Sequence, residues 1–408
     1  MKNYQGFSGF SPELRTQLGL LWAGGGLPPI RGTWFYVDPK AGSNTNGGLS
    51  VDEAVADIQT AYGLCTTGAG DGIVVLSGGT TAANTTSYFD TPLTWSKHGV
   101  TVVGVAAPVA MYGRARIANV ERTTGSLTTI AFPTATTITD SAEGFLTAGF
   151  EVGNVLRVNT TEGTNDGTGH IITAVTAGTI TCAASTFTIQ TAGTAGATTI
   201  NSYCAQLIIV SGSNNIFLNL NIGNWSSDAL ALGAVQVTGN RNYFGGCHFV
   251  GAGHATPAAV AGAYDVEINA GQENTFERCT FGTDTIIRAA ANGNIRFDTN
   301  AWRTRFYNCD IVSYSATAGK GGVLCADATG LEGIQLFKQC SFLNWNENGI
   351  DKVDSVFIGT KPTSGALVMD GCSCVGYTAW DSVAGNDMVY IVNSDATASG
   401  AGGIATTV

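Results

Sequence analysis

Basic residues are scarce in this sequence, which has 19 Lys and Arg against 30 Asp and Glu, and only 12% of its 408 residues are charged. The net charge of −11 argues against a nucleic-acid-binding surface, because such affinity rests largely on Lys and Arg neutralising phosphates. The chain also lacks a run of 18 apolar residues, and no hydrophobic segment of a signal peptide follows Met1 and Lys2. We therefore expect a protein that is made and kept in a cytoplasm, without a membrane partner.

What the sequence does contain is an internal repeat between Val235 and Val392. A cysteine recurs at intervals of 32, 30, 31 and 32 residues, with an apolar residue three positions before it and another two positions after it. The cysteines are Cys247, Cys279, Cys309, Cys340 and Cys372. A second motif, apolar-x-apolar, keeps the same period at Val235/Val237, Val266/Ile268, Ile295/Phe297, Val323/Cys325, Val356/Ile358 and Val389/Ile391.

Both motifs alternate with period two, so each predicts a short strand with one buried face, and Gly, Asn, Asp and Ser crowd the segments between them. A period of 20 to 50 residues built from strands and turns indicates coils stacked along an axis. We therefore predict an all-β fold, a parallel β-helix whose longer loops carry the function.

The ten cysteines are interpreted as buried free thiols rather than disulfides, because at least four of them fall at the same inward phase of consecutive coils. A metal site at Cys372 and Cys374 is disfavoured, since alternation places both side chains on the core face of one strand. The four histidines, His98, His170, His248 and His254, are dispersed. No cofactor and no metal is expected.

Outside the repeat the sequence predicts further segments. An irregular apolar leader is either an arm that docks on a partner or a plug over the end of the solenoid, with a helix starting at Ser11. A capping box at Ser50 and Glu53 predicts a helix to about Tyr62 that covers the first coil. Thr-rich short strands predict a small inserted antiparallel barrel. The predicted segments are 1–32 arm, 33–117 capping helix and first coils, 118–204 inserted barrel, 205–395 main coils and 396–408 tail.

Two stretches resemble known proteins. Tyr36-Val-Asp-Pro, Gly70-Asp-Gly and the strands around them resemble the N-terminal segment of right-handed, pectin-lyase-like β-helix proteins, which implies that hand and fold. Ala148-Gly-Phe150 and Val152-Gly-Asn-Val155 resemble a small β-barrel module of tailed-bacteriophage structural proteins, which implies a virion setting. The Asp clusters of pectate lyases and the His-Gly motif of polygalacturonases are missing, so the fold resemblance brings no active-site residue with it.

The repeat itself offers little chemistry. Glycosidic cleavage needs two carboxylates about 5 to 10 Å apart, but no acid lies beside an acid at the outward positions of the two motifs. Glu267 and Arg296 on successive coils are interpreted as a surface ion pair that contributes little. Acids in the turns, among them Asp298, are interpreted as turn formers. Four tryptophans could serve either as interface anchors or as stacking surfaces for sugars, and we favour the interface role. They are Trp225, Trp302, Trp345 and Trp380.

Together with the two resemblances, these features predict a non-catalytic virion protein, a capsid decoration or cement protein on the particle exterior. Its predicted partners are the capsid lattice and copies of itself in a trimer. The alternative is a tailspike or fibre protein that binds or cleaves a host surface polysaccharide. In the late coils the outward residues of the second motif are apolar, namely Leu324, Phe357 and Tyr390. This predicts an apolar stripe on the surface that is covered either by the C-terminal tail or by a neighbouring copy of the chain. The candidate interface residues are Phe7, Phe10, Leu21, Trp22, Leu324, Phe357 and Tyr390.

Overall fold

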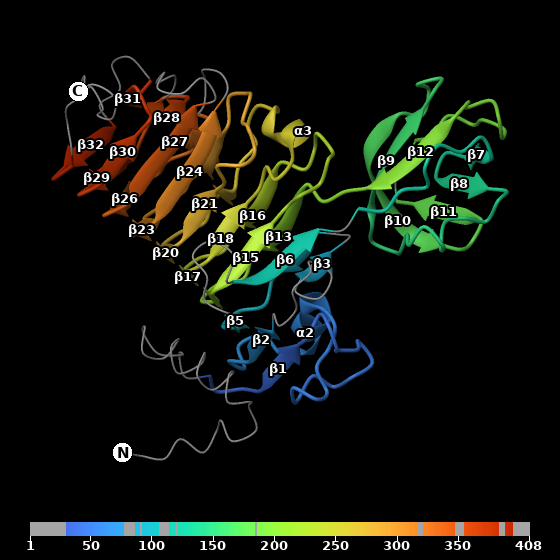
Figure 1. Cartoon of the computed structure of the whole chain (residues 1–408), viewed down its shortest axis with the longest axis horizontal. Helices are drawn as coiled ribbons and strands as arrows, with labels where there is room; N and C mark the ends of the chain where they lie inside the picture. Colours follow the sequence, from blue (N-terminus) through green and yellow to red (C-terminus); the bar gives the residue numbers. More distant parts are fainter. Residues whose placement is uncertain are drawn as a thin grey trace. The chain divides into compact units, whose positions relative to one another are not determined.

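The computed structural model of the chain describes residues 30–76, 86–89, 92–105, 114–119, 121–183, 186–315, 321–346, 355–382 and 388–394. The predicted N-terminal helix start and the interface candidates Phe7, Phe10, Leu21 and Trp22 lie outside these residues, as does the tail 396–408. The chain divides into two compact units, one of residues 1–88, 93–118 and 206–408 and one of residues 89–92 and 119–205. Figure 1 shows the strands of the first unit stacked in successive coils.

The first unit is a right-handed parallel β-helix, as predicted, with three parallel sheets that we name A, B and C. Sheet A contains β1 (Trp34–Val37), β2 (Gly72–Leu76), β5 (Thr101–Val105), β14 (Ile216–Leu218), β17 (Tyr243–Gly245), β20 (Thr275–Glu277), β23 (Arg305–Tyr307), β26 (Ile334–Lys338), β29 (Ala366–Asp370) and β32 (Val389–Val392). Sheet B contains β3 (Thr86–Phe89), β6 (Ala115–Asn119), β15 (Leu220–Gly223), β18 (His248–Val250), β21 (Thr280–Gly282), β24 (Asp310–Ser315), β27 (Ser341–Asn346) and β30 (Ser373–Val375). Sheet C contains β4 (Leu93–Trp95), β13 (Gln206–Val210), β16 (Gly233–Val237), β19 (Val266–Ile268), β22 (Gly293–Phe297), β25 (Gly321–Cys325), β28 (Ser355–Gly359) and β31 (Ala379–Asp381).

The cysteine motif forms the sharp corner between sheets A and B. The residue before each cysteine has positive φ, for example Arg278 at 52° and Asn308 at 51°, which lets the chain turn in one step. Each thiol then donates to a carbonyl of the preceding coil, as Cys279 Sγ does to the Phe244 oxygen at 3.3 Å. Beside these thiols the inward phenylalanines of sheet A stack face to face, and the Phe306 and Phe337 ring centroids are 4.4 Å apart. The repeat read in the sequence is therefore a core ladder.

The helix α2 (Ile58–Leu64) covers the first coils but begins later than predicted. Its N-cap is Asp57, which has extended backbone and accepts from the Thr60 N–H at 2.7 Å. Ser50 and Glu53 instead close a turn, in which the Glu53 N–H meets the Ser50 hydroxyl at 3.2 Å. Ile58, Ala61 and Tyr62 are buried, and the Tyr62 ring lies 4.3 Å from that of Trp95. A second short helix, α3 (Ala255–Ala258), interrupts the connection between β18 and β19.

The second unit is an antiparallel six-stranded sheet in the order β12-β9-β10-β11-β8-β7. Its strands are β7 (Ile130–Thr134), β8 (Thr137–Asp140), β9 (Val155–Thr160), β10 (Gly167–Val175), β11 (Thr179–Cys182) and β12 (Thr198–Ser202). A bridge from Leu127, just before β7, to Thr198 in β12 joins the two edges of the sheet. Phe132, Phe145 and Phe150 lie in its core. Residues 187–190 form no strand, and an isolated bridge joins Phe132 to Gln190.

Candidate functional site

Two long described connections of the solenoid border sheet C. They join β18 to β19 and β21 to β22, and the strands that follow present polar side chains on the outer face of this sheet. Gln236, Glu267 and Arg296 are in register on β16, β19 and β22. Their strands bury apolar neighbours such as Val266 and Ile295 on the other side, so these three side chains are fixed on one rigid face.

Glu267 is the centre of this row. Its Oε2 accepts a hydrogen bond from the Gln236 amide, and its Oε1 lies 3.1 Å from Nε of Arg296. The same guanidinium reaches Asp298 just beyond β22, with Nη2 3.5 Å from Oδ2, and the Asn269 amide donates to this oxygen at 3.4 Å. One arginine therefore holds two carboxyl groups, and we name Glu267 and Asp298 the acid pair.

The two carboxyls of the acid pair differ in exposure. The Glu267 side chain is only 3% exposed, whereas those of Arg296 and Asp298 are each 23% exposed. Burial raises the pKa of Glu267 against the lowering effects of Gln236 and Arg296, and the neighbouring Asp298 raises it further through charge and a hydrogen bond. The inner carboxyl thus favours its protonated form, and the outer one faces solvent.

Tyr264 packs beside Glu267, the buried member of the acid pair. Its ring lies over Gly233, where a Cβ atom would collide with it, and the Arg296 guanidinium lies 5.8 Å from the ring centroid. Burial raises the pKa of the Tyr264 phenol, and the nearby Glu267 raises it further. A neutral phenol therefore helps to keep water from Glu267.

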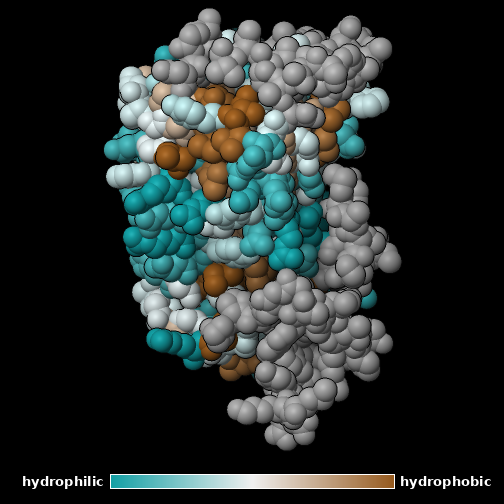
Figure 2. Space-filling model, turned by 90° about the vertical axis from the view of Figure 1, so that its left-hand side faces the viewer, coloured by the Kyte–Doolittle hydropathy of each residue, from teal (hydrophilic) through white to brown (hydrophobic). Residues whose placement is uncertain are grey.

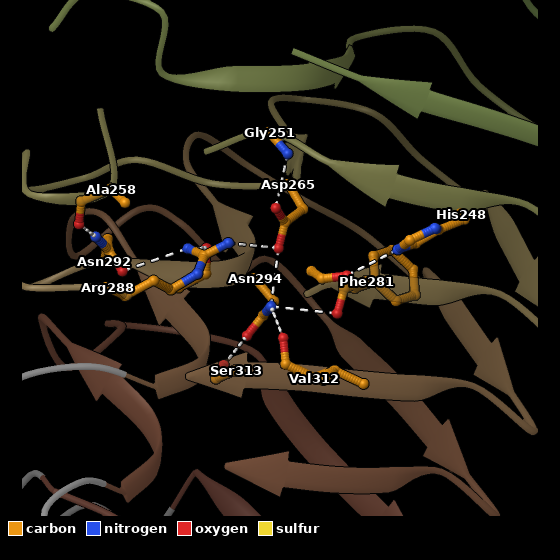
Figure 3. A network of polar contacts seen from close by, with 12 residues as sticks. His248, Gly251, Ala258, Asp265, Phe281, Arg288, Asn292, Asn294, Val312 and Ser313 are labelled. Carbon is orange, nitrogen blue, oxygen red and sulfur yellow. Dashed lines mark hydrogen bonds and ion pairs between the residues drawn. The ribbon is translucent and has the colours of Figure 1, made fainter. Parts of the chain in front are cut away.

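A buried polar network, drawn in Figure 3, includes Asp265 directly before β19 and Asn294 in β22. Arg288 and Asp265 form an ion pair with Nη2 and Oδ2 2.7 Å apart and side chains 4% and 0% exposed. The Gly251 N–H donates to the other Asp265 oxygen at 2.7 Å. Burial raises the pKa of Asp265 although Arg288 and these hydrogen bonds lower it. Removing either partner would leave an uncompensated buried charge.

Asn294 connects this network to three coils. Its amide donates to Asp265 at 2.8 Å and to the Val312 carbonyl at 2.9 Å, and its oxygen accepts from the Ser313 hydroxyl at 2.5 Å. Asp265 stands two residues before Glu267, and Asn294 two residues before Arg296. The network therefore fixes the starts of the two strands that carry the acid pair and its arginine.

Only part of this site was predicted from the sequence. Glu267 and Arg296 were predicted to be neighbours, but they were interpreted as a weak surface ion pair and Asp298 as a turn former. In the structure the three side chains form one half-buried cluster. His248, treated as an isolated histidine, is 2% exposed and contacts the Gly282 carbonyl through Nε2 at 2.8 Å. The common phase of Glu267 and Arg296 on successive coils was a signal for their ion pair, whereas no periodic pattern marks Asp298.

The predicted apolar stripe of Leu324, Phe357 and Tyr390 does not exist. Phe357 is in register with Val323 and fully buried in the core, while Ile358 is the outward partner of Leu324. Tyr390 is 54% exposed, but β32 belongs to sheet A, where Tyr390 continues a row with Leu336 and Val368. Figure 2 shows hydrophobic side chains gathered in two places on one side of the molecule, separated by a polar band.

All ten cysteines are buried thiols, including Cys372 and Cys374. Among the described residues no cluster of His, Cys, Asp or Glu has the arrangement of a metal site. No helix in the described part of the chain has the length and hydropathy needed to cross a membrane.

Comparisons with known proteins concern the fold. No protein-family model matches the sequence, and no curated protein matches it. Among solved structures, pectin methylesterase PemA from Erwinia chrysanthemi is 13% identical, with 93% of this chain and 94% of that chain covered and a TM-score of 0.49. The pectin methylesterase from Aspergillus niger is 12% identical, with 90% and 86% covered and a TM-score of 0.46. A rhamnogalacturonan lyase is 12% identical, with 84% and 68% covered and a TM-score of 0.41.

The chain has the pectin-lyase-like β-helix fold. The similar structures named above are two pectin methylesterases and a rhamnogalacturonan lyase. The prediction of a non-catalytic capsid decoration protein is contradicted by this finding and is wrong. The alternative, a tailspike or fibre protein that binds or cleaves a host surface polysaccharide, agrees with it better in its polysaccharide part.

Proposed function

We propose that the protein is a polysaccharide-processing enzyme that hydrolyses ester groups at the acid pair on sheet C. The observation that carries this proposal is that one arginine, Arg296, lies within ion-pair distance of two carboxyl groups on a rigid outer face. Carboxyls that share a site cannot both ionise easily, so one keeps a proton and the other does not. This division supplies an acid and a base side by side.

The spacing of the acid pair favours acyl hydrolysis over cleavage of a glycosidic bond. Glycosidases separate their two carboxyls by about 5 to 10 Å so that a sugar or a water fits between them. Glu267 and Asp298 instead reach the same guanidinium, with Arg296 Nε 3.1 Å from Glu267 Oε1 and Arg296 Nη2 3.5 Å from Asp298 Oδ2, which brings the two carboxyls close together. A close pair, sharing one proton, is the arrangement of a dyad that activates a water towards a carbonyl carbon.

In the proposed reaction the ionised Asp298 takes a proton from a water, whose oxygen bonds to the ester carbonyl carbon. The developing oxyanion faces the Arg296 guanidinium, which stabilises its charge. When the carbon–oxygen bond to the alcohol breaks, Glu267 gives its proton to the departing oxygen. The products are a carboxylic acid and an alcohol. The proton gained by Asp298 then returns to Glu267 within the acid pair.

The test is release of alcohol from an esterified polysaccharide. Highly methyl-esterified pectin is the first substrate, because several of the similar structures are named for it. Wild-type protein should release methanol, and Glu267→Gln and Asp298→Asn should each lower kcat by about 10²–10⁴-fold. Asp370→Asn, which removes a carboxyl paired with Lys338 on sheet A at 3.4 Å, is the matched control and should keep full activity. The proposal fails if wild-type protein releases no methanol between pH 4 and 9, or if both acid-pair variants remain fully active.

A further inference from the structure

The outer face of sheet B carries three ordered rows of side chains in β24, β27 and β30. One row is polar, with Asp310, Ser341 and Ser373 in register. The second is aliphatic, with Val312, Leu343 and Val375. The third is aromatic, with Tyr314 beside Trp345. Trp345 is 62% exposed, Val375 48% and Leu343 37%. This surface, which we name the sheet B platform, presents large apolar groups to solvent from regular strands.

The platform is rigid because its strands are fastened from behind. Between the outward residues, Ile311, Ser313 and Phe342 point inward and are buried. Ser313 bonds Asn294 of the network in Figure 3, and the Arg288 N–H donates to the Tyr314 carbonyl at 2.8 Å. The aromatic row is therefore held by the same network that fixes the strands of the acid pair.

We propose that the sheet B platform binds a segment of a polysaccharide chain, with sugar rings stacked on Tyr314 and Trp345. Tyrosine and tryptophan offer large flat apolar faces with a polar tip, and they lose little conformational entropy on binding. The carboxylate of Asp310 and the hydroxyls of Ser341 and Ser373 lie on the same face and can accept or donate hydrogen bonds to sugar hydroxyls. This inference rests on the proposed function, since the sheet B platform would be a second binding site for the same polysaccharide.

The size of the platform favours a glycan over a protein. Neighbouring coils are about 4.8 Å apart and strand residues about 3.3 Å apart, so three coils by five residues measure about 10 by 13 Å. A stable protein interface buries about 800 Å² on each partner, which is several times this area. A short segment of sugar chain needs no larger surface.

Binding is measured apart from catalysis with the Asp298→Asn variant, which leaves the substrate intact under the proposed mechanism. Titration calorimetry with highly methyl-esterified pectin should show that a further Trp345→Ala change weakens affinity at least tenfold. Trp345→Phe should keep most of the affinity, because it keeps a stacking face. Ile334→Ala, which removes an equally exposed apolar side chain on sheet A, should leave affinity unchanged.

The outcomes separate this inference from the proposed function. Methanol release by the wild type with unchanged affinity in Trp345→Ala would overturn the platform and leave the function standing. No methanol release, but affinity lost in Trp345→Ala alone, would support the platform and overturn the function. A fall in molecular mass in solution caused by Trp345→Ala would also overturn the platform, since it would assign this surface to contacts between copies of the chain.

Discussion

Glu267 illustrates how a residue can be held in a protonation state that costs the fold some stability. Burial raises its pKa, although Gln236 and Arg296 favour its ionised form. A carboxyl whose pKa is higher in the folded chain stabilises the fold fully only below its unfolded pKa, near 4.3. This contribution is lost as the pH rises through the folded value. At neutral pH the unfolded chain releases this proton, so keeping Glu267 protonated in the folded chain costs stability, as is common in reactive sites.

Replacing Glu267 by Gln should remove this cost in stability. We expect Glu267→Gln to be more stable than the wild type at pH 8, by about 1 kcal/mol, and to lose this advantage as the pH falls towards 4. Urea unfolding of both proteins at a series of pH values measures the difference. Glu332→Gln, an exposed replacement of the same type, should change stability by less than about 0.5 kcal/mol at every pH. A constant or inverted pH dependence would contradict this assignment of the Glu267 pKa.

The residues of the site were only partly predictable from the sequence. The repeat places Glu267 next to Arg296, because both occupy the same phase of successive coils. It says nothing of Asp298, which stands outside the strand and reaches back towards Glu267. The ion pair of Asp265 and Arg288 depends on the path of two irregular connections, and no periodic pattern records that path.

Among the elements, the cysteine corners repeat most faithfully. Cys309 and Cys340, like their equivalents, donate through Sγ to the carbonyl of a phenylalanine one coil earlier, each at 3.5 Å. Elsewhere, burial raises the pKa of Cys65 to about 12 and that of Cys325 to about 11. Thiols that are covered and kept protonated react slowly, because the thiolate is the nucleophile.

This leads to a prediction about thiol reactivity. In the native protein at pH 8, Ellman's reagent should react with none of the ten thiols on the timescale of minutes, and in concentrated urea it should titrate all ten. The absorbance of the released thionitrobenzoate gives the count directly. Fewer than ten thiols in urea without reductant would indicate a disulfide, and a fast native reaction would contradict the burial of the ladder.

The elements that were mispredicted share a physical cause. In Val356-Phe357-Ile358 every position is apolar, so alternation cannot tell which side chain points inward, and a shift of one residue reverses the face. At the helix, both Ser50 and Asp57 are good N-caps by type. Only Asp57 has the extended backbone followed by helical turns that capping requires. In strands where apolar and polar residues alternate, the buried face was predicted correctly from the sequence.

At the scale of the whole molecule, the solenoid runs past the inserted unit without a break. β6 before the insertion pairs directly with β15, and β4 pairs with β13, which begins just after it. Residues 119–205 thus occupy the same kind of connection, from sheet B to sheet C, that residues 224–232 provide in the next coil. Within the described residues, every strand of sheets A, B and C pairs with strands of its own sheet alone.

We therefore expect that the second unit can be removed. A chain in which residues 119–205 are replaced by a Gly-Ser linker as long as the connection 224–232 should fold, with the β-sheet circular dichroism and cooperative unfolding of a solenoid. Its methanol release from esterified pectin, if the proposed function is right, should match that of the wild type, because the acid pair and its network lie on coils after the junction. A second chain with a linker twice as long is the control for a linker that is too short to join the two strands without strain. Doubling the length of a flexible loop raises the free-energy cost of closing it by only about 0.6 kcal/mol. If both shortened chains fail to fold, the second unit is required for the solenoid to form, and the independence argued from the direct pairing of β6 with β15 is wrong.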